Sequence, residues 1–265
     1  MYYLCHIRIT MKRYEKMTWE DISNELKNQM LVIPIGSIEQ HGPHLPVYVD
    51  SYLATKLAEE IAREIGGIIA PTISYGGRSL PGSGGGNYPG TIYINGNTLI
   101  EYYYDIVCGF INSGAKRILI INGHWENEAF IFEAVEKCRE DKHLENRQII
   151  VLSWWSVINE KEMKEIFGTF PGWHAEHAGQ AETALMMYYS STSVKKERMV
   201  DCSAIPPAGI YWYPVPERWS GAKGCLSESK TASAIAGSKL ANLIIKKITL
   251  LINGNNDTSG SVKKI

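Results

Sequence analysis

Long apolar runs are missing from this sequence, and so is any block of charge of one sign. No run approaches the ~20 residues that a membrane-spanning helix needs. The first ten residues are too polar for the core of a signal peptide. The 27 Lys and Arg residues nearly balance the 28 Asp and Glu residues, and they form no basic stripe. We therefore expect a cytoplasmic protein whose partners include neither membranes nor nucleic acid.

Paired cysteines are also missing. The five cysteines are scattered, odd in number and never spaced as Cys-x-x-Cys. This distribution predicts neither a disulfide framework nor a zinc ribbon, and it suits a reducing compartment. We expect Cys108 and Cys138 to pack as small apolar residues on helices.

What the sequence does contain is a regular alternation of strand and helix patterns. Short apolar runs predict buried strands, and apolar residues at helical spacing predict the helices between them. The expected strands are 30–35, 68–73, 117–122 and 148–155, and the expected helices are 51–64, 98–113, 127–140, 180–189 and 230–252. Thr18 and Asp21 form a capping box for a further short helix. The fold class predicted for these 265 residues is α/β, a single domain with a mostly parallel sheet flanked by helices on both faces.

No linker or internal repeat divides this domain. We expect residues 1–16 to be an N-terminal extension, 17–253 to form the domain and 254–265 to be a disordered tail. The Gly- and Ser-rich segment 82–87 lies within the domain and lacks the Lys and Ser or Thr that end a phosphate-binding P-loop. We interpret it as a loop whose backbone approaches a ligand closely.

Two clusters of His and carboxylate side chains follow predicted strands. Glu39 and His41 follow the first of these strands, and His124 and Glu126 follow the third. The members of each pair are two positions apart, so an extended chain turns both side chains to one face. Ligands of open α/β sheets bind beyond the carboxyl ends of the strands. Because imidazole and carboxylate are common ligands of divalent metals, the clusters predict one metal centre between them.

A further carboxylate, Asp50, begins the helix after the first cluster. There it can cap the helix or bridge two metals. With Asp50 the candidate ligands number five, and three of them are carboxylates. Such a set suits two divalent ions ~3.5–4 Å apart, and a water held between them has a lowered pKa and supplies hydroxide at neutral pH.

A third polar segment, residues 172–183, has two interpretations. It can be a polar helix N-terminus, where Glu176 and Glu182 complement the helix dipole. Alternatively, His177 is a proton donor at the metal centre and Trp173 is a wall of its pocket.

Tryptophans accompany the polar clusters. Trp125 lies between two candidate ligands, which places it near the metals, and Trp154 and Trp155 end the strand at 148–155. Indole faces stack well on flat, delocalised or cationic ligands. The pattern therefore indicates a small planar substrate.

These motifs resemble those of the creatininase family of metal-dependent amidohydrolases. Gly36 to Asp50 match the family pattern Gly-x-x-Glu-Gln-His-Gly with a following Asp, and residues 122–124 match its Asn-Gly-His motif. The second motif continues as aromatic-Glu-Asn, as in creatininases proper. The match extends over roughly residues 17–250 through Ser83–Asn87, Leu152–Trp155, Gly172–Trp173, Glu176–His177, Glu182–Thr183 and Lys230–Ser233.

The resemblance implies two divalent metal ions per chain, zinc and manganese. One would be held by Glu39, Asp50 and His124, and the other by His41, Asp50 and Glu126, with Asp50 bridging them. The family also implies a homo-oligomer, a hexamer built as a ring-like assembly of dimers.

The resemblance further implies hydrolysis of the cyclic amide of creatinine to creatine, with His177 and Glu126 as catalytic residues. The substrate pocket would be lined by Ser79, Trp125, Trp173 and His177. Position 125 is a Tyr in the creatininase pattern and a Trp here, so a hydroxyl is lost and the size of the pocket changes.

Three other functions stay open at this point. The chain could be a family amidohydrolase that deformylates a pyrimidine intermediate, or a peptidase that trims a peptide. The bulky Trp125 argues against both, because an indole narrows the pocket. A non-catalytic small-molecule binding protein is the third, and the intact set of candidate ligands argues against it.

Overall fold

The computed structural model describes residues 11–85, 88–142, 146–202, 204, 206–219, 221 and 223–254. Residues 1–10 of the expected extension, Gly86 and Asn87 of the glycine-rich loop, and the tail from residue 255 lie outside the described residues. Within the described ranges, no helix is long and apolar enough to cross a membrane.

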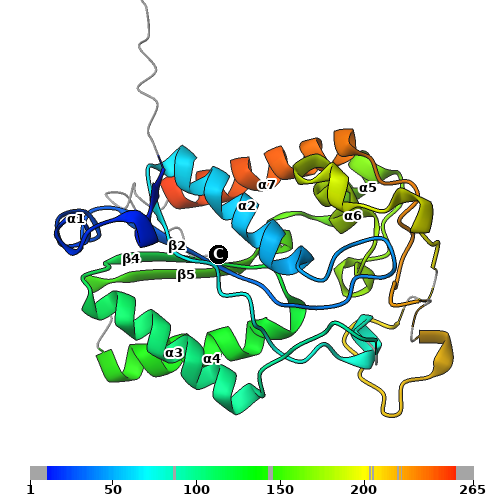
Figure 1. Ribbon diagram of the computed structural model, residues 1–265, viewed down its shortest axis with the longest axis horizontal. Coiled ribbons are helices and arrows are strands. Elements are labelled where there is room, and N and C mark those ends of the chain that lie inside the picture. Colours follow the sequence, from blue (N-terminus) through cyan, green and yellow to red (C-terminus); the bar gives the residue numbers. More distant parts are fainter. Residues whose placement is uncertain are drawn as a thin grey trace, which may run out of the picture.

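A parallel sheet forms the middle of the molecule (Figure 1). Its order is β1-β3-β2-β4-β5, and every described pairing of neighbouring strands is parallel. The strands are β1 Lys12–Arg13, β2 Met30–Ile35, β3 Ile68–Ile69, β4 Arg117–Asn122 and β5 Gln148–Ser153. β2 is apolar throughout and β4 is apolar between Arg117 and Asn122, because both faces of these central strands are covered. Val32 and Leu119 belong to the core on one face, and Leu31 and Ile118 to the core on the other.

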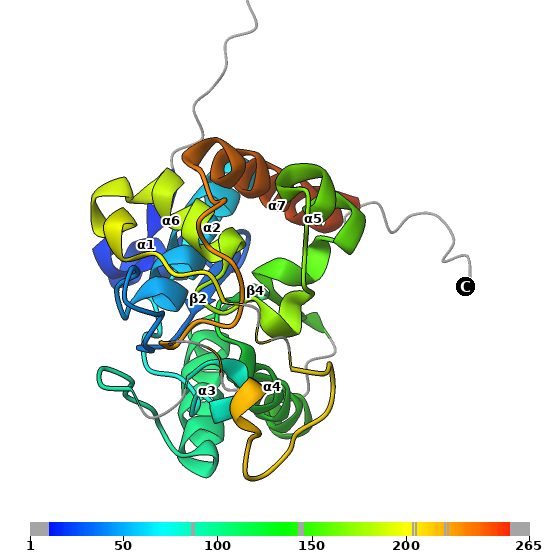
Figure 2. The same ribbon diagram turned by 90° about the vertical axis from the view of Figure 1, so that its right-hand side faces the viewer.

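Helices cover both faces of the sheet, which confirms the predicted α/β fold (Figures 1 and 2). One layer consists of α2 Val49–Ile65, α5 Glu160–Phe167, α6 Gln180–Tyr189 and α7 Ala234–Gly254, and the other of α3 Gly96–Asn112 and α4 Glu128–Lys142. The short α1, Trp19–Glu25, begins with the predicted capping box between Thr18 and Asp21. Short 3-10 helices occupy Tyr14–Lys16, Pro81–Ser83, Trp125–Asn127, Trp154–Val157, Trp173–Ala175, Ser191–Ser193, Lys196–Arg198 and Glu217–Trp219. Cys108 and Cys138 are buried on α3 and α4, as expected.

The structure departs from the sequence predictions at element ends. The predicted strand 68–73 is regular only over Ile68–Ile69, because Pro71 has no backbone N–H to continue the ladder. Trp154 and Trp155 begin a 3-10 helix instead of ending β5. The expected extension contains β1, whose residues pair with β3, so residues 12–16 are part of the fold.

Helices α6 and α7 approach closely at Gly237. A Cβ atom added there would lie 1.9 Å from the carbonyl oxygen of Ala184. We expect Gly237→Ala to lower the free energy of unfolding by about 1–3 kcal/mol, because the backbones must separate. Gly109→Ala on α3 is the matched control, since nothing lies within 4 Å of an added Cβ; it should gain about 0.5–1 kcal/mol. Urea unfolding measures both changes, and equal stability of the two variants would contradict the predicted contact.

Candidate functional site

The carboxyl ends of β2 and β4 bring the two predicted clusters together. Ile35 at the end of β2 pairs with Asn122 at the end of β4, so both loops leave the sheet at the same level. Nδ2 of Asn127 donates to the carbonyl of Gly36 at 3.0 Å and ties one loop to the other. The polar residues that follow each strand therefore face one another across a single site.

The first turn of α2 supplies Asp50 to this site. Its N-cap residue is Tyr48, so Asp50 is free of the capping role that the sequence allowed. A Cβ on Gly36 would lie 2.3 Å from the backbone N of Ser51, and one on Gly123 would lie 2.5 Å from the carbonyl oxygen of Asp50. Glycine at both positions lets the strand ends press directly on the start of the helix. Oγ of Ser37 donates to Asp50 Oδ2 at 2.7 Å and orients its carboxylate.

His124 directs one ring nitrogen at two carboxylates. Its Nδ1 lies 3.0 Å from Glu39 Oε2 and 3.0 Å from Asp50 Oδ2. Its Nε2 lies 3.1 Å from the carbonyl oxygen of Gly77, which can only accept. The proton of the neutral ring therefore sits on Nε2, and the Nδ1 lone pair faces the carboxylates.

His41 has the same arrangement with a different set of carboxylates. Its Nδ1 donates to the carbonyl of Glu39 at 3.0 Å. Its Nε2 lies 3.1 Å from Asp50 Oδ1 and 3.6 Å from Glu182 Oε1, and no hydrogen-bond partner satisfies this buried atom among the described residues. The second group of potential ligands is thus His41, Asp50 and Glu182, where the sequence led us to expect Glu126 in third place.

The donor set fits divalent cations. Two buried groups, one of Glu39, Asp50 and His124 and one of His41, Asp50 and Glu182, each bring their ligand atoms within 4.8 Å of one another and share Asp50. In both groups an imidazole nitrogen faces carboxylate oxygens, an arrangement that repels unless a proton or a metal cation lies between them.

The pKa values of His41 and His124 show that the carboxylates around them stabilise a positive charge. Burial lowers the pKa of His41, but Asp50 and Glu182 outweigh it and the pKa lies well above its usual value. Burial likewise opposes the neighbouring carboxylates at His124, whose pKa is also well raised. Burial raises the pKa of Glu39 to about 7 despite the charge of His124.

His177 approaches the site from the loop before α6. Nε2 of Gln40 lies 3.1 Å from Nε2 of His177 and also donates to the carbonyls of Gly84 at 2.6 Å and Gly224 at 3.1 Å. The other ring nitrogen of His177, Nδ1, faces the carboxylates. That nitrogen lies 3.7 Å from Glu39 Oε1. Burial and the nearby His41 hold the pKa of His177 well below its usual value, so the ring is neutral. The arrangement turns Nδ1 of a neutral imidazole toward the carboxylate cluster.

The remaining sequence candidates occupy different places. Glu126 lines the site, with Oε2 3.3 Å from Nε2 of His124 and Oε1 accepting from the backbone N of Leu80 at 3.1 Å. Ser79, expected to line the substrate pocket, is not among its lining residues; it is buried behind Glu39 and donates to Oε1 of that residue. The structure therefore places Ser79 in contact with Glu39, a potential metal ligand.

The segment before α6 combines both interpretations offered by the sequence. Glu176 accepts from the backbone N of Ala181 and so caps α6, and burial together with the charge of Glu182 raises its pKa to about 8. Glu182 accepts from the backbone N of Ala178 at 2.7 Å through Oε2, while its Oε1 faces His41. Glu182 lies in the first turn of α6, as a charge that complements the helix dipole does. Only Oε2 is used there, and Oε1 is left to face His41.

The described part of the glycine-rich loop packs against side chains of the site. A Cβ on Gly84 would lie 2.3 Å from the ring of His177, and one on Gly85 would lie 1.7 Å from Oγ of Ser79. The expected close approach of this backbone is therefore made to protein side chains.

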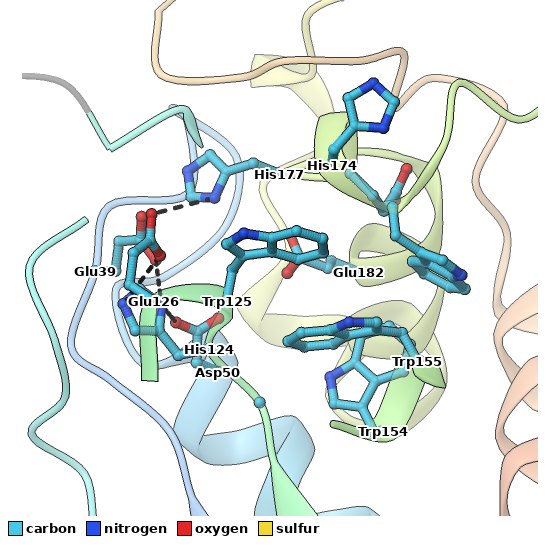
Figure 3. A pocket seen from close by; sticks show the side chains of 13 residues that line it. Glu39, Asp50, His124, Trp125, Glu126, Trp154, Trp155, His174, His177 and Glu182 are labelled. Carbon is cyan, nitrogen blue, oxygen red and sulfur yellow. Dashed lines mark ion pairs between the residues drawn. The ribbon is translucent and has the colours of Figure 1, made fainter. Parts of the chain in front are cut away.

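Indole rings wall the pocket above the carboxylates, which we call the metal pocket (Figure 3). It has about 500 Å³ of empty space, part of it open to solvent. Trp125 stacks on Trp155 with ring centroids 5.9 Å apart and planes 14° apart. Trp173 meets Trp154 edge-on at 5.5 Å, and its Nε1 donates to the carbonyl of Ile158 at 3.1 Å. These contacts fix the rings, and they leave one face of Trp125 uncovered by Trp155.

Sequence comparisons identify relatives of the whole chain. A family model described as "Creatininase: Creatinine amidohydrolase" matches residues 15–252. Creatinine amidohydrolase of Pseudomonas putida is 32% identical over 243 residues, which cover 88% of this chain and 93% of the relative. A 3-dehydro-scyllo-inosose hydrolase of Thermotoga maritima is 31% identical over 71% of this chain and 59% of its own length. A mycofactocin precursor peptide peptidase of Mycobacterium ulcerans is 27% identical over 79% of each chain.

Solved structures agree with this assignment. A variant of creatininase complexed with creatine has a TM-score of 0.86 at 30% identity, covering 93% of this chain and 99% of the other. A Zn–Zn creatininase has a TM-score of 0.85 at 30% identity over 92% of this chain and 97% of the other. A manganese creatininase has a TM-score of 0.84 at 31% identity over 92% and 98%. The chain, with its two groups of potential metal ligands beside a tryptophan-lined pocket, belongs to the creatininase family of amidohydrolases.

Proposed function

We propose that this chain hydrolyses the cyclic amide of creatinine to give creatine, using one zinc and one manganese ion per chain. The observation that carries the proposal is the pair of ligand groups that share Asp50 at the base of a tryptophan-walled pocket. A flat, delocalised ring suits a pocket with an uncovered indole face. The homohexamer implied by the family motifs remains a prediction.

The residues that hold the cations differ in one place from the expected set. Glu39, Asp50 and His124 would hold one ion, and His41, Asp50 and Glu182 the other. Bound there, the cations supply Lewis-acid polarisation of the amide carbonyl and lower the pKa of a water molecule.

Ring opening consumes one water and requires a proton on the departing nitrogen. His177 is neutral and turns Nδ1 to the site, so it can take up the proton that the attacking water loses and deliver it to that nitrogen. Glu126 lines the same pocket, where its carboxylate can receive a proton from the water and return it. The indole rings of Trp125 and Trp173 orient the substrate and exclude bulk water.

The metal content of variants at Glu182 and Glu126 shows which of the two residues is a metal ligand. We expect Glu182→Gln to retain about one ion per chain, because it removes a ligand charge from the second group only. Glu126→Gln should retain both ions and lose turnover by about a hundredfold, the usual scale of acid–base catalysis. Elemental analysis of the two purified variants measures the first effect and a turnover assay the second. Loss of an ion from Glu126→Gln alone would make Glu126 the ligand.

A substrate panel tests the proposed activity. The metal-loaded protein is given creatinine, creatine, other cyclic amides, a formamidopyrimidine nucleotide and a short peptide. We expect interconversion of creatinine and creatine with no deformylation, since the metal pocket has carboxylates and indoles and no Lys or Arg among its lining residues to pair with a phosphate. Deformylation or peptide cleavage without turnover of creatinine would replace this proposal. Binding of creatinine without any turnover would indicate the non-catalytic alternative.

A further inference from the structure

A second pocket adjoins the metal pocket, and we call it the outer pocket. It has about 640 Å³ of empty space, part of it open to solvent, and lies against segment 206–219 (Figure 2, gold). Trp125 and His174 line both pockets, so the two pockets adjoin at these side chains. A group attached to a ligand on the metal site would have only the side chain of Trp125 or His174 to pass before it met the outer pocket.

The lining of the outer pocket selects for apolar, aromatic groups. No Asp, Glu, Lys or Arg is among its lining residues, which are aromatic, aliphatic, Gly or Pro apart from His174. A charged group would lose its hydration there without gaining an ionic partner. An aryl group would instead meet the rings of Tyr211, Trp212 and Trp219.

The aromatic side chains of this segment are exposed but held in place. Tyr211 is 61% exposed and Trp212 is 58% exposed. Neighbouring aromatic side chains with this much exposure are typical of a binding site. The rings of Trp212 and Trp219 meet edge-on at 5.9 Å, and the guanidinium of Arg218 lies 5.0 Å from the ring of Trp219. These contacts hold the rings of Trp212 and Trp219 in place when no ligand is bound.

We propose that the outer pocket is an aryl subsite of the same active site, and that the chain acts on cyclic amides carrying an aromatic substituent. The amide ring lies in the metal pocket and the substituent passes Trp125 to reach Trp212. Creatinine, whose only carbon substituent is a methyl group, fills the first pocket and leaves the second unused. The inference rests on the proposed ring hydrolysis and specifies its substrate class.

The test compares creatinine with two counterparts, one with benzyl in place of the N-methyl group and one with benzyl on the ring carbon. At least one should exceed creatinine in kcat/KM by about tenfold to a hundredfold, the gain expected from burying a phenyl group. In Trp212→Ala the ratio of benzyl to methyl kcat/KM should fall toward one. Trp19→Ala should keep the wild-type ratio, since Trp19 is an exposed tryptophan on α1, at the opposite end of the molecule in Figure 1.

Calorimetric titration of the metal-loaded protein separates this proposal from the proposed function. If the protein hydrolyses neither creatinine nor the benzyl compounds, the proposed function is wrong. Tighter binding of a benzyl compound than of creatinine, lost in Trp212→Ala, would still support the aryl subsite. Equal dissociation constants for all three rings would overturn it, as would a benzyl preference that Trp212→Ala leaves unchanged.

Discussion

Asp50→Ala is expected to lose both metal ions and almost all turnover. Asp50 is the one residue common to the two ligand groups, with Oδ1 3.1 Å from Nε2 of His41 and Oδ2 3.0 Å from Nδ1 of His124. Its removal leaves each group with two ligands, too few to hold a divalent ion against water. Turnover should fall by more than about a thousandfold, because no cation then lowers the pKa of water or polarises the amide. Elemental analysis measures the metals and a creatinine assay the turnover.

Two further variants control the Asp50 experiment. Asp50→Asn keeps the shape of the side chain and removes its charge, so it should also lose metal. Asp105→Ala removes an exposed carboxylate from α3 and should keep both ions. The metal-free Asp50→Ala protein should remain folded, because Asp50 lies outside both apolar cores that hold the helices on the sheet. Full metal content in Asp50→Ala would refute the shared role of this residue.

His177→Ala is expected to keep its metals and lose at least about a hundredfold in turnover, the scale of general acid–base catalysis. His177 also lies in a buried group with Glu39 and His41 that has metal-binding geometry, so metal content is an informative measurement. Its Nδ1 lies 3.7 Å from Glu39 Oε1, close enough for either a proton transfer or a shared cation. A proton donor in this position affects the rate, whereas a ligand affects occupancy.

His174→Ala is the matched control for His177, because both residues line the metal pocket and His174 is only half-buried. It should lose less than about tenfold, since it lies across the pocket from the carboxylates (Figure 3). Near-normal turnover in His177→Ala would remove His177 from the reaction. Loss of one ion from that variant would instead make it a metal ligand.

The central sheet could be predicted because its signal is local. β2 and β4 are apolar on both faces, which only a strand covered on two sides requires, and their boundaries agree with the prediction. β1 could not be predicted, because Lys12 and Arg13 have no apolar pattern and join the sheet only through pairing with β3. Trp154 and Trp155 were predicted as strand but begin a 3-10 helix, because an apolar sequence does not distinguish a buried strand from a buried turn.

The position of Glu182 depends on tertiary structure, and sequence reasoning therefore missed its contact with His41. A glutamate in the first turn of a helix is typical of dipole compensation, and Oε2 of Glu182 has that environment. Its Oε1 meets His41 only because α6 packs beside the loop after β2. One signal was available in the sequence: Glu182 is the one charged residue of Gln180–Tyr189, and a carboxylate in so uncharged a helix needs a partner when the helix is buried.

The contact of Gly36 and Gly123 with the start of α2 has an evolutionary consequence. Because main-chain atoms meet there, the spacing of Glu39, Asp50 and His124 is inherited with the backbone. The pocket walls come from separate stretches of chain, among them segment 206–219, which carries none of the potential ligands. After gene duplication, the segments that line the pocket can thus change, and the substrate with them, while the potential metal ligands keep their positions. Such descent suits a family whose members are named for chemically unrelated substrates.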